Sequence, residues 1–183
     1  MFIHKDTKPQ RYFFLCLCVF VCTIVTTMKK TNAARLLDSK SIHYELAEYE
    51  VDESDLSTTT LAKKIGQNIE QIFKTLVLRG DKTGVFAAVI PGNSEVDLKK
   101  AAKVSGNKNC AMVQQKELLG LTGYIRGGCS PLGMKKPYPI YIHETCQLFD
   151  RIFISAGQRG LQLKLNSEDL IAITDAEVCD VAE

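Results

Sequence analysis

Residues 73–90, FKTLVLRGDKTGVFAAVI, decide the fold of this 183-residue chain. Two apolar runs, 73–79 and 85–90, have the pattern of β-strands, and residues 80–84 between them have the glycines of a hairpin loop. The stretch therefore predicts an antiparallel strand pair. Lys74 interrupts the first apolar run. Because lysine is rarely buried without a partner, we expect its side chain to point into a cleft and not into the core.

Short elements flank this hairpin. Before it, we expect helices at 31–38 and 57–65 and a strand at 43–49. After it, Ser94 begins a capping box for a helix through Lys103. The remaining elements are strands near 110–113, 139–143, 151–155, 161–165 and 177–181, and helices near 115–119 and 167–173. Because few long helices separate the strands, the order predicts an α/β (α+β) fold: a mixed, partly antiparallel sheet or barrel with peripheral helices.

The first 27 residues differ from the rest. Basic residues precede a fourteen-residue apolar run, 12–25, which is the order found in an export signal, and the run is shorter than the roughly 20 residues of a membrane span. Met28 then begins a polar sequence, with no clear cleavage site before it. We expect translation to begin at Met28, so that 1–27 is an apolar leader upstream of one domain, 28–183. A signal or membrane anchor is the alternative.

The expected domain has balanced charge. Residues 1–27 contain three of the 23 basic and one of the 21 acidic side chains, which leaves 20 of each in 28–183. A protein that binds nucleic acid mainly by neutralising phosphates is strongly basic. This domain is therefore expected to bind no nucleic acid, to bind it weakly through a local patch, or to rely on a partner. Its four cysteines are scattered, which argues against zinc and favours a reducing, cytoplasmic location.

Residues 123–136, GYIRGGCSPLGMKK, are the main candidate for chemistry. Adjacent glycines followed by Ser130 and Pro131 exclude a regular strand or helix interior, and such a loop can aim backbone N–H groups at an anion or a polarised carbonyl. A surface turn is the simpler alternative. A second glycine turn within 154–162, ISAGQRGLQ, favours a built site. Three basic side chains add positive charge to the first loop: Arg126, Lys135 and Lys136.

A conventional nucleophile is not evident in this domain. His43 and His143 lie in strand-like segments, and the common catalytic and nucleotide-binding motifs do not occur. Cys129 is the one tempting thiol, but no histidine is near in sequence to accept its proton. What is left is a site of backbone donors and a lysine, which suits a substrate that is already activated or carries its own nucleophile.

Four segments in this order, FKTL (73–76), LKKAA (98–102), GYIRGGCSPLGMKK (123–136) and ISAGQRG (154–160), resemble the YbaK/EbsC family of bacterial Cys-tRNA(Pro) deacylases. The resemblance extends from about Lys29 to the C-terminus. It implies a mixed, mostly antiparallel, barrel-like sheet of six to seven strands, with no cofactor and no metal. Residue 129 is not kept as cysteine in that family, which weakens a covalent role for Cys129.

The resemblance implies a trans-editing enzyme that clears cysteine from mischarged tRNA(Pro), with Cys-tRNA(Cys) as a further substrate. Cysteine is close to proline in size, so binding alone separates the two poorly. In the mechanism favoured for the family, the cysteinyl sulfur attacks its own ester carbonyl and leaves as a thiolactone. The implied partners are the 3′ aminoacyl end of the mischarged tRNA and prolyl-tRNA synthetase in a ternary complex, and no membrane is implied for the domain.

The resemblance also assigns roles to single residues. Lys74 would position the terminal adenosine and its ester, the Gly127 N–H would face the carbonyl oxygen, and Tyr49 would help to enclose the substrate. The other implied substrate-binding residues are Gly128, Ser130, Pro131, Ser155 and Gly157, with Arg126, Lys135 and Lys136 as phosphate contacts or as solvated surface charge. Two other functions stay open: an editing domain for Ala-tRNA(Pro) or another mischarged tRNA that uses water, and a non-catalytic module that binds tRNA or a synthetase.

Overall fold

The computed structural model describes residues 30–183, so the expected leader, 1–27, lies outside the described residues. The described helices and strands alternate much as the sequence predicted. They are α1 (Asn32–Ser39), β1 (Tyr44–Glu48), α2 (Thr58–Ile65), β2 (Phe73–Gly80), β3 (Gly84–Pro91), α3 (Leu98–Val104), β4 (Cys110–Met112), α4 (Gln115–Thr122), β5 (Ile140–His143), β6 (Arg151–Ser155), β7 (Leu161–Asn166), α5 (Ser167–Thr174) and β8 (Glu177–Cys179), with short 3₁₀ helices at Ile69–Gln71 and Glu144–Leu148.

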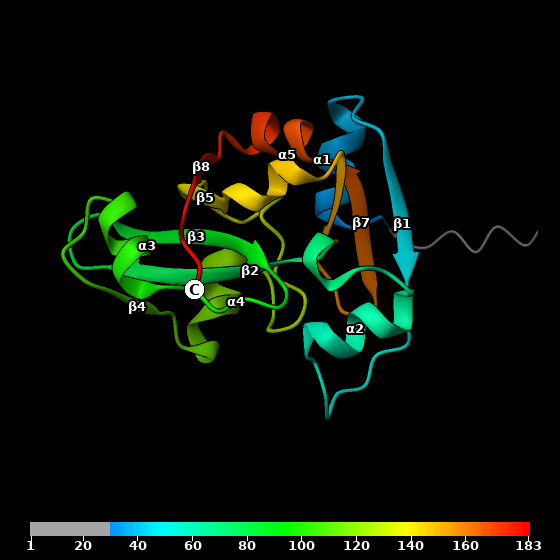
Figure 1. The fold of residues 1–183 in the computed structure, drawn as a ribbon, viewed down its shortest axis with the longest axis horizontal. Coiled ribbons are helices and arrows are strands. Elements are labelled where there is room, and N and C mark those ends of the chain that lie inside the picture. Colours follow the sequence, from blue (N-terminus) through cyan, green and yellow to red (C-terminus); the bar gives the residue numbers. More distant parts are fainter. Residues whose placement is uncertain (1–29) are drawn as a thin grey trace, which may run out of the picture.

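The strands form two sheets (Figure 1). One is three-stranded in the order β1-β7-β6 and the other is five-stranded in the order β4-β2-β3-β5-β8. The pairs β1–β7, β6–β7, β2–β3 and β2–β4 are antiparallel, whereas β3–β5 and β5–β8 are parallel. An isolated parallel bridge between Ile72 and Phe153 joins the start of β2 to β6.

These pairings confirm the mixed, mostly antiparallel α+β class and change its details. The described chain has the eight strands that the sequence pattern predicted, more than the six to seven that the family resemblance implied, and between residues 30 and 183 they form two sheets and no closed barrel. The difference arises from long-range pairing. Strand β8, close to the C-terminus, extends the larger sheet by pairing in parallel with β5, and a sequence pattern does not specify that choice of neighbour.

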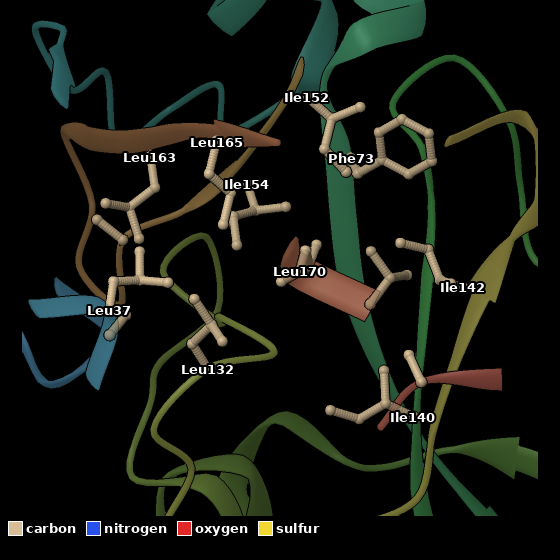
Figure 2. Close-up of a cluster of buried hydrophobic side chains, with 14 of the residues drawn as sticks. Leu37, Phe73, Leu132, Ile140, Ile142, Ile152, Ile154, Leu163, Leu165 and Leu170 are labelled. Carbon is tan, nitrogen blue, oxygen red and sulfur yellow. The ribbon is translucent and has the colours of Figure 1, made fainter. Parts of the chain in front are cut away.

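The main core lies between the two sheets and helices α1 and α5. Apolar side chains that alternate along β6 and β7 meet those of β5 and β2. Figure 2 shows this cluster, whose largest buried members are Leu37, Phe73, Leu132, Ile142, Ile152, Ile154, Leu163, Leu165 and Leu170. Leu132 comes from the predicted glycine loop and is only 1% exposed. The loop is therefore anchored in the core.

Strand β2 has neighbours on both sides for only part of its length. β3 pairs with all of Phe73–Gly80, whereas β4 pairs only with Leu78, Arg79 and Gly80. Alternate residues of an antiparallel strand direct their backbone groups to the same edge. Because the Val77 C=O accepts from the Val113 N–H at 2.9 Å, the backbone groups of Thr75 point to that same edge, beyond the end of β4. Between the Ile72–Phe153 bridge and Val77, the described strands thus leave the edge of β2 at Thr75 open.

The second face of the larger sheet is covered by α3 and the C-terminal residues. Leu78, Phe86 and Ile90 are buried there against Ala101 and Val181. The Asp97 N–H donates to the Val181 C=O at 3.1 Å, which ties the segment before α3 to the C-terminus. Across residues 30–183, no helix has both the length and the apolar character that crossing a bilayer requires.

Helix α3 begins three residues later than the sequence predicted. The expected cap was Ser94, but the side chain of Asp97 accepts from the N–H groups of Lys99 at 2.8 Å and Lys100 at 3.1 Å. The carboxylate satisfies two N–H groups that have no partner within the helix. Thr31 and Ser57, the first residues of the two helices predicted before the hairpin, are the caps that precede α1 and α2, and Gly66 ends α2 in the left-handed conformation.

We predict that Asp97→Ala lowers the free energy of unfolding by about 1 kcal/mol, because it removes both capping hydrogen bonds. Gln114→Ala is the matched control, since Gln114 occupies the same position before α4 and its side chain makes no capping hydrogen bond. Urea denaturation of the two variants and the parent protein measures the difference. Equal losses in both variants would contradict the assignment of Asp97 as the cap.

Candidate functional site

A cavity of about 720 Å³ opens at the open edge of β2. Its walls come from segments 49–61, 72–77, 92–95 and 112–118, from the glycine loop at 126–129, and from Ser155 and Gln162. Five of the sequence-predicted site residues line it: Tyr49, Lys74, Arg126, Gly127 and Ser155. The fold thus brings together residues that are up to 106 positions apart in the chain.

The other sequence-predicted residues lie behind the wall or outside it. Gly128, Ser130 and Pro131 are buried, and the Ser130 hydroxyl accepts from the Leu132 N–H at 3.3 Å, which is a turn-stabilising contact. Gly157 follows Ser155, whose hydroxyl accepts from the Gly157 N–H at 3.3 Å. Lys135 and Lys136 are exposed and do not line the cavity. A direct contact of these residues with a substrate stays a prediction.

Gly127 offers an unused backbone donor to the cavity. Its φ is +82°, a conformation that favours glycine, and a Cβ there would lie 3.2 Å from Leu56 Cδ1. Within residues 30–183 the Gly127 N–H has no acceptor, whereas the next N–H, that of Gly128, donates to the Ile125 C=O at 3.0 Å. The Gly127 N–H is therefore available to a ligand, as are the N–H groups of Arg126 and Cys129, which also line the cavity and have no acceptor among residues 30–183.

The loop that carries Gly127 is held by the second glycine turn. The Arg159 guanidinium donates through Nε to the Arg126 C=O at 3.0 Å and through Nη1 to Glu53 Oε1 at 3.1 Å. A Cβ on Gly128 would lie 3.1 Å from the carbonyl carbon of Gln158, so the two turns are in close contact. One arginine thus connects the turn, the glycine loop and the segment that forms the opposite wall.

Tyr124 braces the same loop from inside. Its hydroxyl donates to the Leu132 C=O at 2.6 Å and contacts the Gly133 C=O at 3.1 Å. Burial raises the pKa of Tyr124 to about 12, so the hydroxyl keeps its proton at neutral pH and remains a donor. The loop is therefore preorganised before any ligand arrives.

Lys74 lines the cavity, as the sequence predicted. Its Nζ lies 3.1 Å from Glu95 Oε1, in a pair whose side chains are 24% and 79% exposed. Successive residues of a strand face opposite sides of the sheet. Lys74 and Thr75 therefore lie on different faces, yet both line the cavity. The cavity consequently extends around the open edge of β2.

Two cavity carboxylates are poor proton acceptors. Asp55 accepts from Thr60 Oγ1 at 2.5 Å and from the Ser57 N–H at 2.9 Å, and these bonds lower its pKa to about 2. The pKa of Asp52 is also lowered, mainly by hydrogen bonds from the hydroxyl and N–H of Ser54. A general base works best with a pKa near the working pH. Neither aspartate fits that role.

Cys129 also lacks the properties of a nucleophile. It is 8% exposed, and burial raises its pKa to about 12, so the thiol is protonated at neutral pH. The cavity-lining residues include no histidine. In the described part of the chain, no three His, Cys, Asp or Glu side chains converge as metal ligands would.

Sequence reasoning missed three residues that shape the cavity: Leu56, Thr75 and Gln162. Leu56 lies over Gly127 from a distant segment, and no pattern around it indicates this contact. Thr75 and Gln162 were within reach. Thr75 lies in the segment 73–90 and Gln162 in the segment 154–162, and alternation along β2 places Thr75 on the face opposite Lys74.

Comparisons with known proteins agree on one family. The sequence model of the aminoacyl-tRNA editing domain matches residues 53–173. A protein of Enterococcus faecalis named "Putative Cys-tRNA(Pro)/Cys-tRNA(Cys) deacylase EbsC" is 46% identical over 155 residues, which are 85% of this chain and 94% of that protein. The matched region contains Lys74, Gly127 and Ser155, and Tyr49 precedes the domain model.

Two further similarities concern prolyl-tRNA synthetase. A solved structure described as "a putative trans-editing enzyme for prolyl tRNA synthetase" has a TM-score of 0.72 and 27% identity, covering 81% of this chain and 93% of its own. A proline–tRNA ligase of Shouchella clausii is 29% identical over 99 residues, which are 54% of this chain and only 17% of the ligase. The chain thus resembles a free-standing protein and also a segment within a synthetase.

We predict that Gly157→Ala destabilises the protein by about 2–4 kcal/mol. Gly157 has a φ of +95°, and a Cβ there would lie 2.7 Å from Tyr124 Cε1, so the change strains the backbone and displaces the side chain that braces the loop. Gly120→Ala is the control: Gly120 lies within α4 with nothing within 4 Å of its Cβ position, and about 0.5–1 kcal/mol of stabilisation is expected. Urea denaturation measures both. Equal effects would contradict the packing described.

Proposed function

The chain belongs to the aminoacyl-tRNA editing domain family, as its motifs predicted, and we propose that it is a trans-editing deacylase that removes cysteine from mischarged tRNA(Pro). Cys-tRNA(Cys) is proposed as a further substrate. One observation carries the proposal: the cavity offers a preorganised, unpaired N–H at Gly127 and the ammonium of Lys74, but no ionised thiol and no histidine. Such a site stabilises charge and leaves the attack to another group.

The proposed reaction uses the thiol of the substrate. The cysteinyl sulfur forms a bond to its own ester carbonyl carbon, and the resulting oxyanion accepts a hydrogen bond from the Gly127 N–H. When the intermediate collapses, the bond to the ribose 3′ oxygen breaks and the thiol proton ends on that oxygen. The products are tRNA with a free 3′ end and a four-membered cysteine thiolactone, which water then opens. Lys74 holds the ester and adds positive charge near the developing oxyanion.

The alternative of water as nucleophile has less support. Water needs a general base. Of the four carboxylates that line the cavity, Asp52 and Asp55 have lowered pKa values and Glu95 is paired with Lys74, which leaves Glu50 as the remaining candidate. A base with a pKa of about 2 is weak at neutral pH. A purely binding role is the second alternative, and it differs from the deacylase in predicting no loss of deacylation when Lys74 is removed.

We predict that Lys74→Ala lowers the rate of Cys-tRNA(Pro) deacylation by roughly 10²–10³-fold, as removal of an oxyanion-stabilising group does elsewhere. The fold should persist, because the exposed pair with Glu95 contributes little to stability. Lys99→Ala is the matched control: Lys99 is exposed on nearby α3 and does not line the cavity. Unchanged deacylation by Lys74→Ala, measured with radiolabelled aminoacyl-tRNA, would remove the catalytic assignment of this cavity.

The choice of nucleophile is tested separately. tRNA(Pro) carrying S-methylcysteine should survive the enzyme, whereas Cys-tRNA(Pro) should be cleaved to thiolactone, detected by mass spectrometry. Cys129→Ala should change that rate by less than about threefold, because its protonated thiol plays no part in the reaction. Cleavage of the S-methyl substrate and of Ala-tRNA(Pro) at comparable rates would instead support the use of water.

The proposed partner is prolyl-tRNA synthetase, bound to the same tRNA. The expected domain is electrically neutral, which limits its own attraction for phosphates. The ligase similarity shows that a related segment lies within a synthetase chain, where the rest of the enzyme can hold the tRNA. A free-standing editing domain can likewise use the synthetase to hold the tRNA if it docks on the complex of synthetase and tRNA.

We therefore predict that tRNA(Pro) binds this protein about tenfold or more tightly when prolyl-tRNA synthetase is present, because the linked complex raises the effective concentration of the acceptor end. Fluorescence anisotropy with labelled tRNA, with and without the synthetase, gives the two affinities. A non-cognate synthetase is the control. Equal affinities in all three conditions would refute the ternary partner while leaving the deacylase proposal intact.

A further inference from the structure

One polar atom in the cavity wall has no partner in the protein. Among residues 30–183, Thr75 Oγ1 is the buried side-chain nitrogen or oxygen without a hydrogen bond, and the residue is 8% exposed. Buried hydroxyl groups normally find partners, because an unpaired one is left with an uncompensated desolvation cost. The oxygen itself is enclosed, but Thr75 lines the cavity, so a rotation of its side chain can turn the hydroxyl toward a ligand.

Thr75 faces the glycine loop. Phe73, Thr75 and Val77 alternate onto one face of β2, and Val77 packs against Cys129 in the wall of the cavity. This is the face opposite Lys74. The part of the cavity that Thr75 lines is therefore the part closest to the loop that carries the proposed oxyanion donor.

Two more uncommitted polar groups line the cavity from the other sheet. Gln162 on β7 is 4% exposed, and its side-chain amide makes no hydrogen bond to any residue that the structure describes. Ser155, its register partner on β6, uses its hydroxyl oxygen as an acceptor from Gly157, which leaves the hydroxyl proton available. Because β6 starts beside β2 at the Ile72–Phe153 bridge, we place Ser155 and Thr75 on the same side of the cavity.

The side chains of Thr75, Ser155 and Gln162, which line the cavity together, are polar and uncharged. The carboxylates that line the cavity belong to the segment 50–55 and to Glu95, which precedes α3. A buried ammonium needs a counter-charge or several acceptors, so the α-ammonium of an aminoacyl group fits beside those carboxylates. A neutral group that is both a weak donor and a weak acceptor, such as a thiol, fits beside the hydroxyl and amide groups.

We propose that Thr75 is a specificity-determining residue whose hydroxyl binds the side-chain sulfur of the cysteinyl group, an inference that rests on the deacylase function proposed above. The sulfur is separated from the ester carbonyl carbon by only two carbon atoms, so with that carbonyl at Gly127 the side chain falls within the loop-facing part of the cavity. Rotation about the Cα–Cβ bond of Thr75 exchanges its methyl and hydroxyl groups and turns the hydroxyl toward the ligand. An aminoacyl group without a polar side chain leaves that hydroxyl unpaired, which is the basis of discrimination.

The test uses stable ligands that differ in one group. Amides of 3′-amino-3′-deoxyadenosine with cysteine and with 2-aminobutyrate have the same shape, but a methyl group replaces the thiol in the second. We expect the parent protein to bind the cysteinyl amide about tenfold more tightly by calorimetry. Thr75→Val should reduce this ratio to about one to threefold, and Thr75→Ser, which keeps the hydroxyl, should retain it.

A stability measurement separates this role from a structural one. Valine has nearly the shape of threonine and removes the unpaired oxygen, so Thr75→Val should raise the melting temperature by about 2–4 °C while selectivity falls. If Thr75 had only a structural role, the Thr75→Val protein would instead be less stable and would bind both amides more weakly by the same factor. That result would overturn the proposal.

Deacylation of Cys-tRNA(Pro) by the parent protein is measured in parallel. If the parent protein cleaves Cys-tRNA(Pro) but Thr75→Val leaves the affinity ratio of the two amides unchanged, the role of Thr75 is overturned and the deacylase function is not. Absence of cleavage and of binding to either amide would overturn the deacylase function and the role of Thr75 with it.

Discussion

The open edge of β2 is the constraint on which the rest of the site depends. Backbone N–H and C=O groups at a sheet edge must be paired, hydrated or covered. In this chain β4 ends at Met112 and β6 touches only the start of the strand. The gap between them is covered by side chains and loops and not by another strand, and it becomes the cavity. A longer β4 would pair the edge and close the site.

The walls around this gap are largely loops and turns, and contacts with the core and with each other hold them in place. Leu132 anchors the glycine loop in the main core, and the Tyr124 hydroxyl joins two parts of the loop by donating to the Leu132 C=O. Arg159 connects the loop to the opposite wall through Arg126 and Glu53. The Gly127 donor therefore keeps its orientation in the empty site. A donor that is already in place needs no reorganisation when charge develops, which is the main source of electrostatic catalysis.

Much of this arrangement could be predicted from the sequence. The remaining features depend on contacts between segments that are far apart in the chain. The hairpin of β2 and β3, the helices that follow Thr31 and Ser57, and the importance of residues 123–136 follow from local patterns and motifs. The number of sheets, the position of β8 and the approach of Leu56 to Gly127 do not, because they depend on which distant segments meet. Thr75 is an intermediate case: strand alternation assigns its face, but only the neighbours around it show that its hydroxyl has no partner.

In the proposed mechanism the reactive thiol comes from the substrate. Burial raises the pKa of Cys129 and keeps its own thiol protonated. An ionised cysteine in this wall would oppose the proposed reaction, because a fixed negative charge beside Gly127 would repel the oxyanion. The basic residues that line the cavity, Lys64, Lys74 and Arg126, avoid this conflict. In the proposed mechanism, such a cavity acts on substrates that carry their own nucleophile, and the correctly charged prolyl ester, which has no thiol, is left intact.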